Sequence, residues 1–543
     1  MKKQFLSIGM AAVMLGTALP CLPVMSTAVC AADLTYEQFS YKVIEGGIEI
    51  TKFDKSTDDA VIPAEIDGQP VISIGSNAFD SCSTLSSVTI PDTVKTIGIA
   101  AFKSCKALQS VEIPDGVTTI ESKTFYQCTS LASVTLPKNL KEIGAQAFQQ
   151  TALTAADIPE GVLTVGKEAF QGCASLESLT LPESLVSIKD RAFEGTAITT
   201  LSVPGGITDL GYYAFLGCRK LLKVEIAEGI TDIGTSTFAN CESLCSLSLP
   251  TTLTSIGSSA FTGCTSLMTL EIPENVVSIG SNAFSSCSSL SEINIPGSVR
   301  TIGNLAFYLC KSAASLHIEE GITSIGEEAF KGITGITEVV IPKSVTSIGK
   351  EAFTGCTGVM SVELPDSLTD IGANAFQNCT SLTSIVIPDR VTGIGAESFS
   401  GCKALSSVTL PNTGSFISIG QKAFYNCKAL SAITIPGSVT GIGKDAFTGC
   451  TGIVISGYDK TAAEKYANNT NTAFNSLGKL PGDFNDDGTA NLKDAVLIRR
   501  HIAGGWDVTL DESQLDLNKD GKVNLKDVVL LRRYIAGGWN VTL

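Results

Sequence analysis

One unit of about 23 residues recurs along most of this chain, and it limits the possible folds more than any other feature. A phenylalanine, usually preceded by alanine, marks each unit, and it occupies positions 79, 102, 125, 148, 170, 193, 215, 238, 261, 284, 307, 330, 353, 376, 399, 424 and 447. This column gives seventeen units, with two steps of 22 residues and one of 25. One such unit is too small to bury its apolar side, whereas stacked units share a continuous core. The repeat therefore predicts a β-rich solenoid.

The apolar residues of each unit keep fixed places relative to the phenylalanine. Counted from it, Cys lies at +3, Leu at +6, Val at +9, Ile at +11, Pro at +12, Val at +15 and Ile-Gly at +18 and +19. In the coil that begins at Phe261, Leu270 and Ile272 alternate like a short strand with one buried face, and Pro273 ends its pairing. Gly280 is expected to supply a turn that needs freedom in φ. At a strand spacing of roughly 4.8 Å, seventeen coils predict a curved rod on the order of 80 Å long.

The cysteines follow the same period. Of the 17 in the chain, fourteen lie three residues after a repeat phenylalanine: Cys82, Cys105, Cys128, Cys173, Cys218, Cys241, Cys264, Cys287, Cys310, Cys356, Cys379, Cys402, Cys427 and Cys450. So many cysteines in an exported chain would normally suggest disulfides. However, Thr151, Thr196 and Ile333 take this place in other coils, so bridging is not obligatory. We interpret the column as buried thiols that pack as small apolar side chains; the alternative is a ladder of disulfides between coils.

This pattern resembles the BspA-type leucine-rich repeat over about residues 60 to 455, and it recurs in register throughout. The segment 41–75 resembles the N-terminal cap of that family, and 449–478 resembles its closing unit. Caps are physically required, because a terminal coil otherwise exposes apolar surface and an unpaired edge. We therefore predict a cap over 33–75, repeats over 76–455, and a closing unit with a linker over 456–481.

The predicted solenoid surface offers little chemistry. Its strand positions are small and hydroxyl-rich, and its tyrosines flank the phenylalanine column instead, at Tyr126, Tyr212, Tyr213, Tyr308 and Tyr425. Those tyrosines either contact a glycan or protein ligand or simply pack on the surface. Glu327 and Glu328 have the residue type for acid–base catalysis, but adjacent acids in a turn are typical of a solvated edge. His317 has no second ligand beside it for zinc. The sequence therefore predicts no enzyme.

From Gly482 onward the chain becomes rich in Asp, Asn, Lys and Arg. This region contains two similar 12-residue loops, "DFNDDGTANLKD" from Asp483 to Asp494 and "DLNKDGKVNLKD" from Asp516 to Asp527. Each places oxygen ligands at loop positions 1, 3, 5, 7, 9 and 12, with glycine at position 6. The candidate ligands are Asp483, Asn485, Asp487, the Thr489 carbonyl, Asn491 and Asp494 in the first loop, and Asp516, Asn518, Asp520, the Lys522 carbonyl, Asn524 and Asp527 in the second. Hard oxygen donors around a glycine turn suit Ca²⁺. We expect two structural calcium ions, without which the loops would unfold.

The layout around these loops distinguishes two families. An ordinary EF-hand pair needs a helix that enters each loop, yet "GKLPG" precedes the first loop and is a poor helix former. A duplicated loop followed by a helix, with Asp at position 12, resembles the type I dockerin, and the resemblance covers residues 482 to 543. It implies a small all-α module that binds a cohesin domain of a scaffold protein, as in a cellulosome.

The resemblance also implies which residues contact the cohesin. Dockerins use loop-relative positions 10, 11, 17 and 18, which here are Leu492, Lys493, Arg499 and Arg500, repeated as Leu525, Lys526, Arg532 and Arg533. Because the two sets are the same, either helix is expected to dock in the same cohesin groove after a half-turn. The alternative for the arginines is an ordinary solvated helix face. Trp506 and Trp539 pack either in the module's core or at its rim.

The ends and the charge of the chain indicate where it works. Residues 1–32 combine Lys2 and Lys3 with an apolar run and small residues near Ala31, which is typical of a cleaved secretory signal. A net charge of −16 argues against nucleic acid as a partner, and no later segment is long and apolar enough to insert in a membrane.

Together these features predict a secreted, scaffold- or cell-surface-associated protein without catalytic activity. Its dockerin binds a cohesin, and its solenoid presents a surface for a protein or plant cell-wall glycan. Two alternatives stay open: a passive spacer, or a component that inhibits or modulates enzymes of the assembly.

Overall fold

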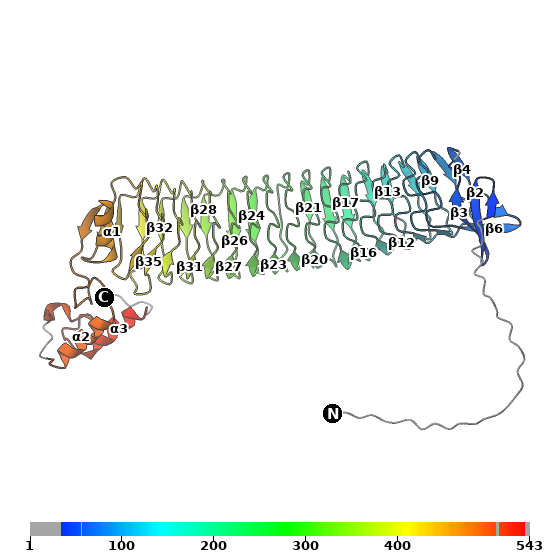
Figure 1. Ribbon diagram of the computed structural model, residues 1–543. Helices are drawn as coiled ribbons and strands as arrows, with labels where there is room; N and C mark the ends of the chain where they lie inside the picture. Colours follow the sequence, from blue (N-terminus) through cyan, green and yellow to red (C-terminus); the bar gives the residue numbers. More distant parts are fainter. Residues whose placement is uncertain (1–33, 56, 506–509, 538–543) are drawn as a thin grey trace, which may run out of the picture.

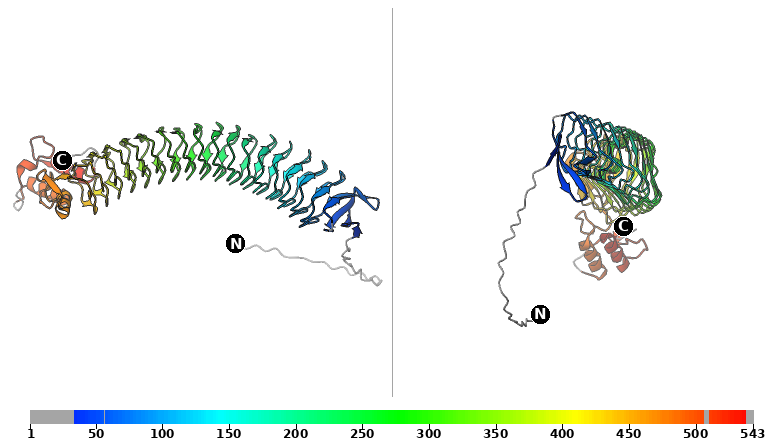
Figure 2. Two further views of the ribbon diagram at one scale, coloured as in Figure 1. Left: turned by 90° about the horizontal axis from the view of Figure 1, so that it is seen from above. Right: turned by 90° about the vertical axis from the view of Figure 1, so that its right-hand side faces the viewer.

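The computed structural model describes residues 34–55, 57–505 and 510–537. A long solenoid occupies most of the chain, and a small helical module lies beside its C-terminal end (Figure 1). Seen from above, the solenoid bends into a smooth arc (Figure 2). The predicted β-solenoid followed by a small all-α module is therefore confirmed. The signal segment 1–32, Trp506 and Trp539 lie outside the described residues.

Two parallel ladders of short strands run along the solenoid. The first contains β4 (Asp59–Val61), β7 (Ser87–Thr89), β9 (Ser110–Glu112), β11 (Ser133–Thr135), β13 (Ala155–Asp157), β15 (Ser178–Thr180), β17 (Thr200–Val203), β19 (Lys223–Ile226), β21 (Ser246–Ser248), β24 (Glu292–Ile295), β26 (Ser315–Ile318), β28 (Glu338–Val340), β30 (Ser361–Glu363), β32 (Ser384–Val386), β34 (Ser407–Thr409), β36 (Ala432–Thr434), β38 (Val454–Gly457) and β39 (Ala473–Ser476). The second contains β6 (Gln69–Ile74), β8 (Thr96–Ile97), β10 (Thr119–Ile120), β12 (Glu142–Ile143), β14 (Thr164–Val165), β16 (Ser187–Ile188), β18 (Asp209–Leu210), β20 (Asp232–Ile233), β22 (Ser255–Ile256), β23 (Ser278–Ile279), β25 (Thr301–Ile302), β27 (Ser324–Ile325), β29 (Ser347–Ile348), β31 (Asp370–Ile371), β33 (Gly393–Ile394), β35 (Ser418–Ile419) and β37 (Gly441–Ile442).

The strand expected at Leu270 and Ile272 is not formed, although both side chains are buried. Alternation of apolar residues predicts burial, and burial does not require a hydrogen-bonded ladder. The prediction of a strand was therefore wrong in this coil, while the predicted buried face was right.

A stack of aromatic rings fills the centre of the solenoid. Neighbouring repeat phenylalanines are parallel, with ring centroids from 4.7 Å (Phe79 and Phe102) to 5.7 Å (Phe307 and Phe330). These distances lie in the range of offset stacking. Phe53 of the cap extends the stack at one end, and the ring of Tyr466 closes it edge-on at the other. Each coil is thus held to its neighbours by the same buried contact.

Residues with a left-handed backbone conformation flank each repeat phenylalanine, but the glycine that we expected to adopt it does not. Gly280 does not adopt a positive φ; a Cβ there would lie 2.6 Å from the Ser258 backbone nitrogen of the preceding coil. Glycine is needed at this place for close approach between coils. The positive φ angles fall instead two residues before and two residues after the phenylalanine, as at Asn282 (59°) and Ser286 (62°).

The fifteen cysteines among the described residues are all free, and all except Cys245 are buried. Most thiols of the repeat column donate a hydrogen bond to the carbonyl of the phenylalanine one coil back, as Cys264 does to Phe238 at 3.3 Å. The structure therefore agrees with the interpretation of the column as buried thiols.

Both ends of the solenoid are capped. At the N-terminus, β1 (Leu34–Tyr36), β2 (Phe39–Ile44) and β3 (Gly47–Phe53) form an antiparallel sheet that joins β6, and β5 (Glu65–Ile66) pairs with β6 on its other side. At the C-terminus, α1 (Ala462–Thr470) packs on the last strands. The helical module contains α2 (Leu492–Ile502), the short 3₁₀ helix η1 (Glu512–Gln514) and α3 (Leu525–Ile535), and it has its own small apolar core.

Candidate calcium and partner-binding site

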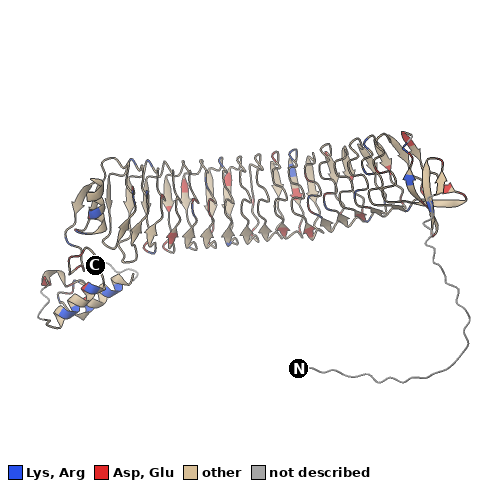
Figure 3. Cartoon of the chain, in the orientation of Figure 1, with Lys and Arg blue, Asp and Glu red and all other residues tan. Residues whose placement is uncertain are grey.

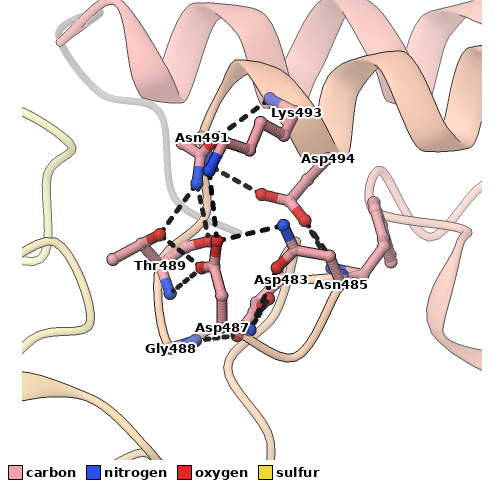
Figure 4. Close-up of polar contacts among 9 residues, drawn as sticks. Asp483, Asn485, Asp487, Gly488, Thr489, Asn491, Lys493 and Asp494 are labelled. Atoms are coloured by element: carbon pink, nitrogen blue, oxygen red, sulfur yellow. Dashed lines mark hydrogen bonds and ion pairs between the residues drawn. The ribbon is translucent and has the colours of Figure 1, made fainter.

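The first loop of the helical module folds around its predicted ligands. Its two best-placed carboxylates are tied to the backbone: Asp483 accepts hydrogen bonds from the Asp487 and Gly488 amides at 3.1 and 2.7 Å, and Asp494 accepts one from the Phe484 amide at 2.9 Å. The Asn485 side-chain oxygen accepts from the Asp487 amide at 3.0 Å. Figure 4 shows the loop side chains gathered around one point.

The second loop repeats this geometry. Asp516 accepts from the Asp520 and Gly521 amides at 3.1 and 2.7 Å, and Asp527 accepts from the Asn518 amide at 3.2 Å. The counterpart of this last bond in the first loop is the one that Asp494 accepts from the Asn485 amide at 3.1 Å. The internal duplication in the sequence is therefore also a duplication in structure.

Position 12 of each loop joins the loop to the helix that follows. Asp494 and Asp527 are fully buried. Each also completes a capping box, because its carboxylate accepts from the amide of the N-cap asparagine, Asn491 or Asn524, at 2.8 Å. A negative charge at this place also complements the helix dipole. The shorter Asp side chain therefore has a structural role at a position where ordinary EF-hands use Glu.

The donor set fits a hard cation. Burial, followed by the charges of Asp494 and Asp487, raises the pKa of Asp483 above its usual value, so these carboxylates repel one another within the loop. The described residues contain no cluster of three or more His, Cys, Asp or Glu side chains that is arranged to hold a metal. The predicted ligand set differs from such a cluster, because it combines Asp carboxylates with Asn side-chain oxygens and a backbone carbonyl oxygen. Calcium loops use this combination of ligands.

The predicted cohesin-contact residues lie on the outer surfaces of α2 and α3. Leu492 and Leu525 are 59% and 60% exposed, which is unusual for leucine. The lysines and arginines of both sets are exposed as well. Figure 3 shows this concentration of basic residues on the two helices, while charges on the solenoid are scattered.

Sequence reasoning missed part of this surface. Val496 and Val529 lie four residues after the two leucines, one helical turn further on, and are 53% and 55% exposed. On α3, a depression of about 380 Å³ is lined by Asn518, Leu525, Lys526, Val529, Leu530 and Arg533. Spacing along the helix was the signal that would have revealed the valines.

An exposed tyrosine, Tyr212, lies at a cavity of the solenoid. Tyr212 is 56% exposed and lies at a cavity of about 520 Å³ that Asp190, Asp209 and Asp232 also line. There the second ladder is interrupted, because β18 ends one sheet and β20 begins the next. The Tyr212 amide donates to Asp190 at 2.9 Å, and Lys189 holds the pKa of Asp209 below its usual value.

The other solenoid candidates have structural explanations. Glu327 pairs with Lys350 at 3.1 Å and Glu328 with Lys331 at 2.8 Å, which are surface ion pairs. His317 is exposed on β26 opposite Asn294 of β24. His317 also lines a cavity of about 440 Å³ together with Glu271 and Glu292.

A leucine-rich-repeat solenoid joined to a duplicated loop–helix module is the class that these features define. The model of the BspA type leucine rich repeat region matches residues 60–174, 141–246, 232–359 and 323–454, so the chain belongs to the BspA-type leucine-rich-repeat family. The model of the dockerin type I domain matches residues 481–536, and the C-terminal module is therefore a type I dockerin. Both are non-catalytic kinds of domain.

Solved structures similar to this chain include leucine-rich repeat proteins. A leucine-rich repeat protein from Bacteroides ovatus is 28% identical, with a TM-score of 0.50, and the match covers 82% of this chain and 100% of that chain. A leucine rich cell surface protein from Faecalibacterium prausnitzii is 26% identical over 80% of this chain and 97% of that chain, with a TM-score of 0.37. The comparison with curated proteins found no match. Among the described residues, no helix has the length and apolar character needed to cross a membrane.

Proposed function

We propose that this protein is a secreted, non-catalytic component of an extracellular scaffold assembly such as a cellulosome. Its dockerin binds a cohesin through α2 or α3, and its solenoid presents a ligand-binding surface. The observation that carries the docking part is the duplicated, exposed surface of leucine, valine, lysine and arginine on two helices that have the same geometry. Exposed apolar residues ringed by polar ones are typical of interaction sites.

The proposed calcium ligands are the twelve loop residues, six in each loop, for one ion per loop. Asp483, Asp487 and Asp494 would hold the first ion together with the oxygens of Asn485, Thr489 and Asn491, and the second loop would do the same. When bound, calcium neutralises the converging carboxylates and fixes the shape of each loop, which in turn orients the helices.

Substitutions in each helix test the docking surfaces. The first variant replaces Leu492, Lys493, Arg499 and Arg500; the second replaces Leu525, Lys526, Arg532 and Arg533; the third replaces both sets. With two equivalent surfaces, either single set should leave cohesin binding nearly intact, and the combined variant should abolish it. Loss of binding after replacement of Arg499 and Arg500 alone would contradict the dual arrangement. Far-UV circular dichroism in calcium checks that each variant is folded.

For the solenoid, the cavity at Tyr212 favours ligand binding over a passive spacer. A half-exposed aromatic ring offers a platform for the apolar face of a sugar, and carboxylates beside it accept hydrogen bonds from hydroxyl groups. We infer that a plant cell-wall glycan is the ligand.

This inference is tested with the full chain captured on an immobilised cohesin, then exposed to soluble xylan, mannan, mixed-linkage glucan and pectin, and separately to secreted bacterial proteins. Saturable retention of one glycan that falls at least tenfold in Tyr212→Ala supports the site. Tyr36→Ala, at an exposed tyrosine of the cap, is the matched control. Retention of none of the glycans would support the spacer, and retention of a protein would move the ligand class to protein.

A further inference from the structure

The two halves of the dockerin are nearly identical in sequence, but they differ in what surrounds them. Tyr534 near the end of α3 is only 5% exposed, whereas the side chain of its counterpart on α2, His501, is 21% exposed and faces Glu512. A Cβ added to Gly488 of the first calcium loop would overlap the Lys460 carbonyl oxygen, whereas one added to its counterpart Gly521 would have nothing within 4 Å. The two halves therefore have different environments, and at His501 and Tyr534 the residues differ as well.

The surroundings of Tyr534 belong to the solenoid. A Cβ placed on Gly414 would overlap the Tyr534 carbonyl oxygen, and one placed on Gly537 would lie 3.2 Å from the Ser415 Cβ. Burial raises the pKa of Tyr534, and the side chain of Ser438 in the solenoid partly offsets this shift. Gly414 and Ser415 lie in the one coil of 25 residues, from Phe399 to Phe424.

A second contact joins the first calcium loop to the closing unit. The Lys460 ammonium forms an ion pair with Asp486, at loop position 4, where the second loop has Lys519. Between the two contacts, Leu480 of the connecting segment is 6% exposed and packs on Gly437. Figure 1 shows the helical module beside this end of the solenoid.

From these contacts we propose that the last coils of the solenoid are a built-in platform that holds the dockerin in one orientation. The parts that lie on this platform are the C-terminal end of α3 and the first calcium loop of the same chain. The 25-residue coil supplies the platform surface, with glycine at 414 because the α3 backbone approaches too closely for a side chain. Lys460 supplies a charge that only the first loop complements, so the pseudo-twofold dockerin attaches one way round.

The proposed cohesin surfaces are exposed while the dockerin is attached to the platform. A cohesin bound to the dockerin would therefore fix the direction of the whole solenoid, and the solenoid would extend from the scaffold as an arm at a set angle. This proposal does not depend on which cohesin binds or on what the solenoid binds.

Small-angle X-ray scattering and hydrogen exchange on the full chain in calcium test the platform. The wild type should scatter as one rigid, elongated conformation, with slow exchange at 410–416 and 530–537. Gly414→Val should raise exchange several-fold in both segments and increase the radius of gyration. The control is Gly441→Val, because Gly441 has ordinary φ and nothing within 4 Å of an added Cβ. A wild type that already scatters as a flexible ensemble, or a Gly414→Val variant that matches the control, would overturn the proposal.

A charge swap gives an independent test that does not rely on packing. Lys460→Glu should raise exchange in the same segments, though less than Gly414→Val does because the ion pair is half-exposed, and the double variant Lys460→Glu with Asp486→Lys should restore the wild-type exchange. Lysine is compatible with this loop position, because the second loop carries Lys519 there. Failure of the double variant to restore protection would contradict the ion-pair contact. Calcium-dependent cohesin binding should persist in all these variants, so loss of the platform is distinguishable from loss of docking.

Discussion

At the scale of single residues, backbone conformation explains much of the composition of the repeat. Eight coils place glycine two residues after the phenylalanine, all with positive φ, and others place Ser, Asn, Gln or Leu there with φ near 60°. The left-handed conformation costs a residue with a Cβ about 1–2 kcal/mol and costs glycine almost nothing.

Gly217→Ala should therefore lower the free energy of unfolding by about 1 kcal/mol through backbone strain alone. Gly217 has a φ of 69° and nothing within 4 Å of an added Cβ, so no packing change contributes. Gly441→Ala is the matched control, since its surroundings are equally open and its φ is ordinary. Urea unfolding of both variants measures the difference. Equal stability of the two would show that the left-handed conformation is not what requires glycine.

The buried thiols predict a loss of stability at high pH. Burial raises the pKa of Cys264, Cys310, Cys356 and Cys402 to about 12, from an ordinary value of 9.0. The folded state then keeps protons that the unfolded state releases, so stability is constant below pH 9 and falls as the pH rises from 9 towards 12. Thermal unfolding between pH 8 and 11 should show a falling midpoint. A flat profile would indicate that the column is not protonated thiol.

Accessibility of the thiols is a separate prediction. Because Cys245 is the exposed cysteine among the described residues, native protein that starts at residue 33 should react with one equivalent of iodoacetamide, at Cys245. After denaturation without reductant, all fifteen should react. Mass spectrometry counts the adducts, and fewer than fifteen in the denatured sample would reveal disulfides between coils.

At the scale of structural elements, each coil depends on its neighbours. Within the stack, each phenylalanine ring packs on the rings of the two adjacent coils, at 5.7 Å for Phe307 and Phe330. Stability in such a stack is close to a sum of coil terms and nearest-neighbour terms.

Phe307→Ala should cost about 3–5 kcal/mol, as expected for a large side chain removed from a core. Combined with Phe330→Ala, it should show an interaction free energy of about 0.5–3 kcal/mol, whereas combination with the distant Phe125→Ala should be additive. Denaturant unfolding of the single and double variants measures these terms. Coupling of equal size in both pairs would contradict nearest-neighbour behaviour.

The elements also indicate how far sequence reasoning reaches. The spacing of Phe, Leu and Ile was enough to predict the solenoid, because a strict period leaves one way to stack coils. It did not predict which coils form hydrogen-bonded strands, as residues 268–273 illustrate, or that Gly280 is needed for contact and not for its φ. Both depend on distances between coils, which a single unit does not encode.

In the dockerin, too, local features could be predicted from the sequence and contacts between distant segments could not. Its loop ligands could be proposed from spacing, because each loop is local in sequence, and its helix contacts from the resemblance to type I dockerins. The packing of Tyr534 on Gly414 could not, since it joins segments far apart in the chain, and the extra residues of the 25-residue coil gave no indication of their partner. The burial of Asp494 and Asp527 behind a capping box likewise appeared only in the structure.

At the scale of the whole molecule, the two domains have different sources of stability. The solenoid has one continuous apolar core, and the dockerin has a small one supported by its loops. A chelator should therefore unfold residues 483–537 and leave the solenoid intact, since metal binding and folding are coupled in such modules. Hydrogen exchange in calcium and in EGTA locates the change. Uniform exchange under both conditions would mean that calcium does not hold the dockerin together.

The central claim is that the dockerin docks this chain to a cohesin through calcium-ordered, duplicated helix surfaces. Isothermal titration of the full chain with a panel of type I cohesins, in calcium and again in EGTA, tests it most directly. We predict saturable binding of one cohesin per chain with at least one member of the panel, and no detectable heat of binding in EGTA. Binding that survives EGTA, or no binding by any cohesin while the dockerin is folded in calcium, would contradict the account.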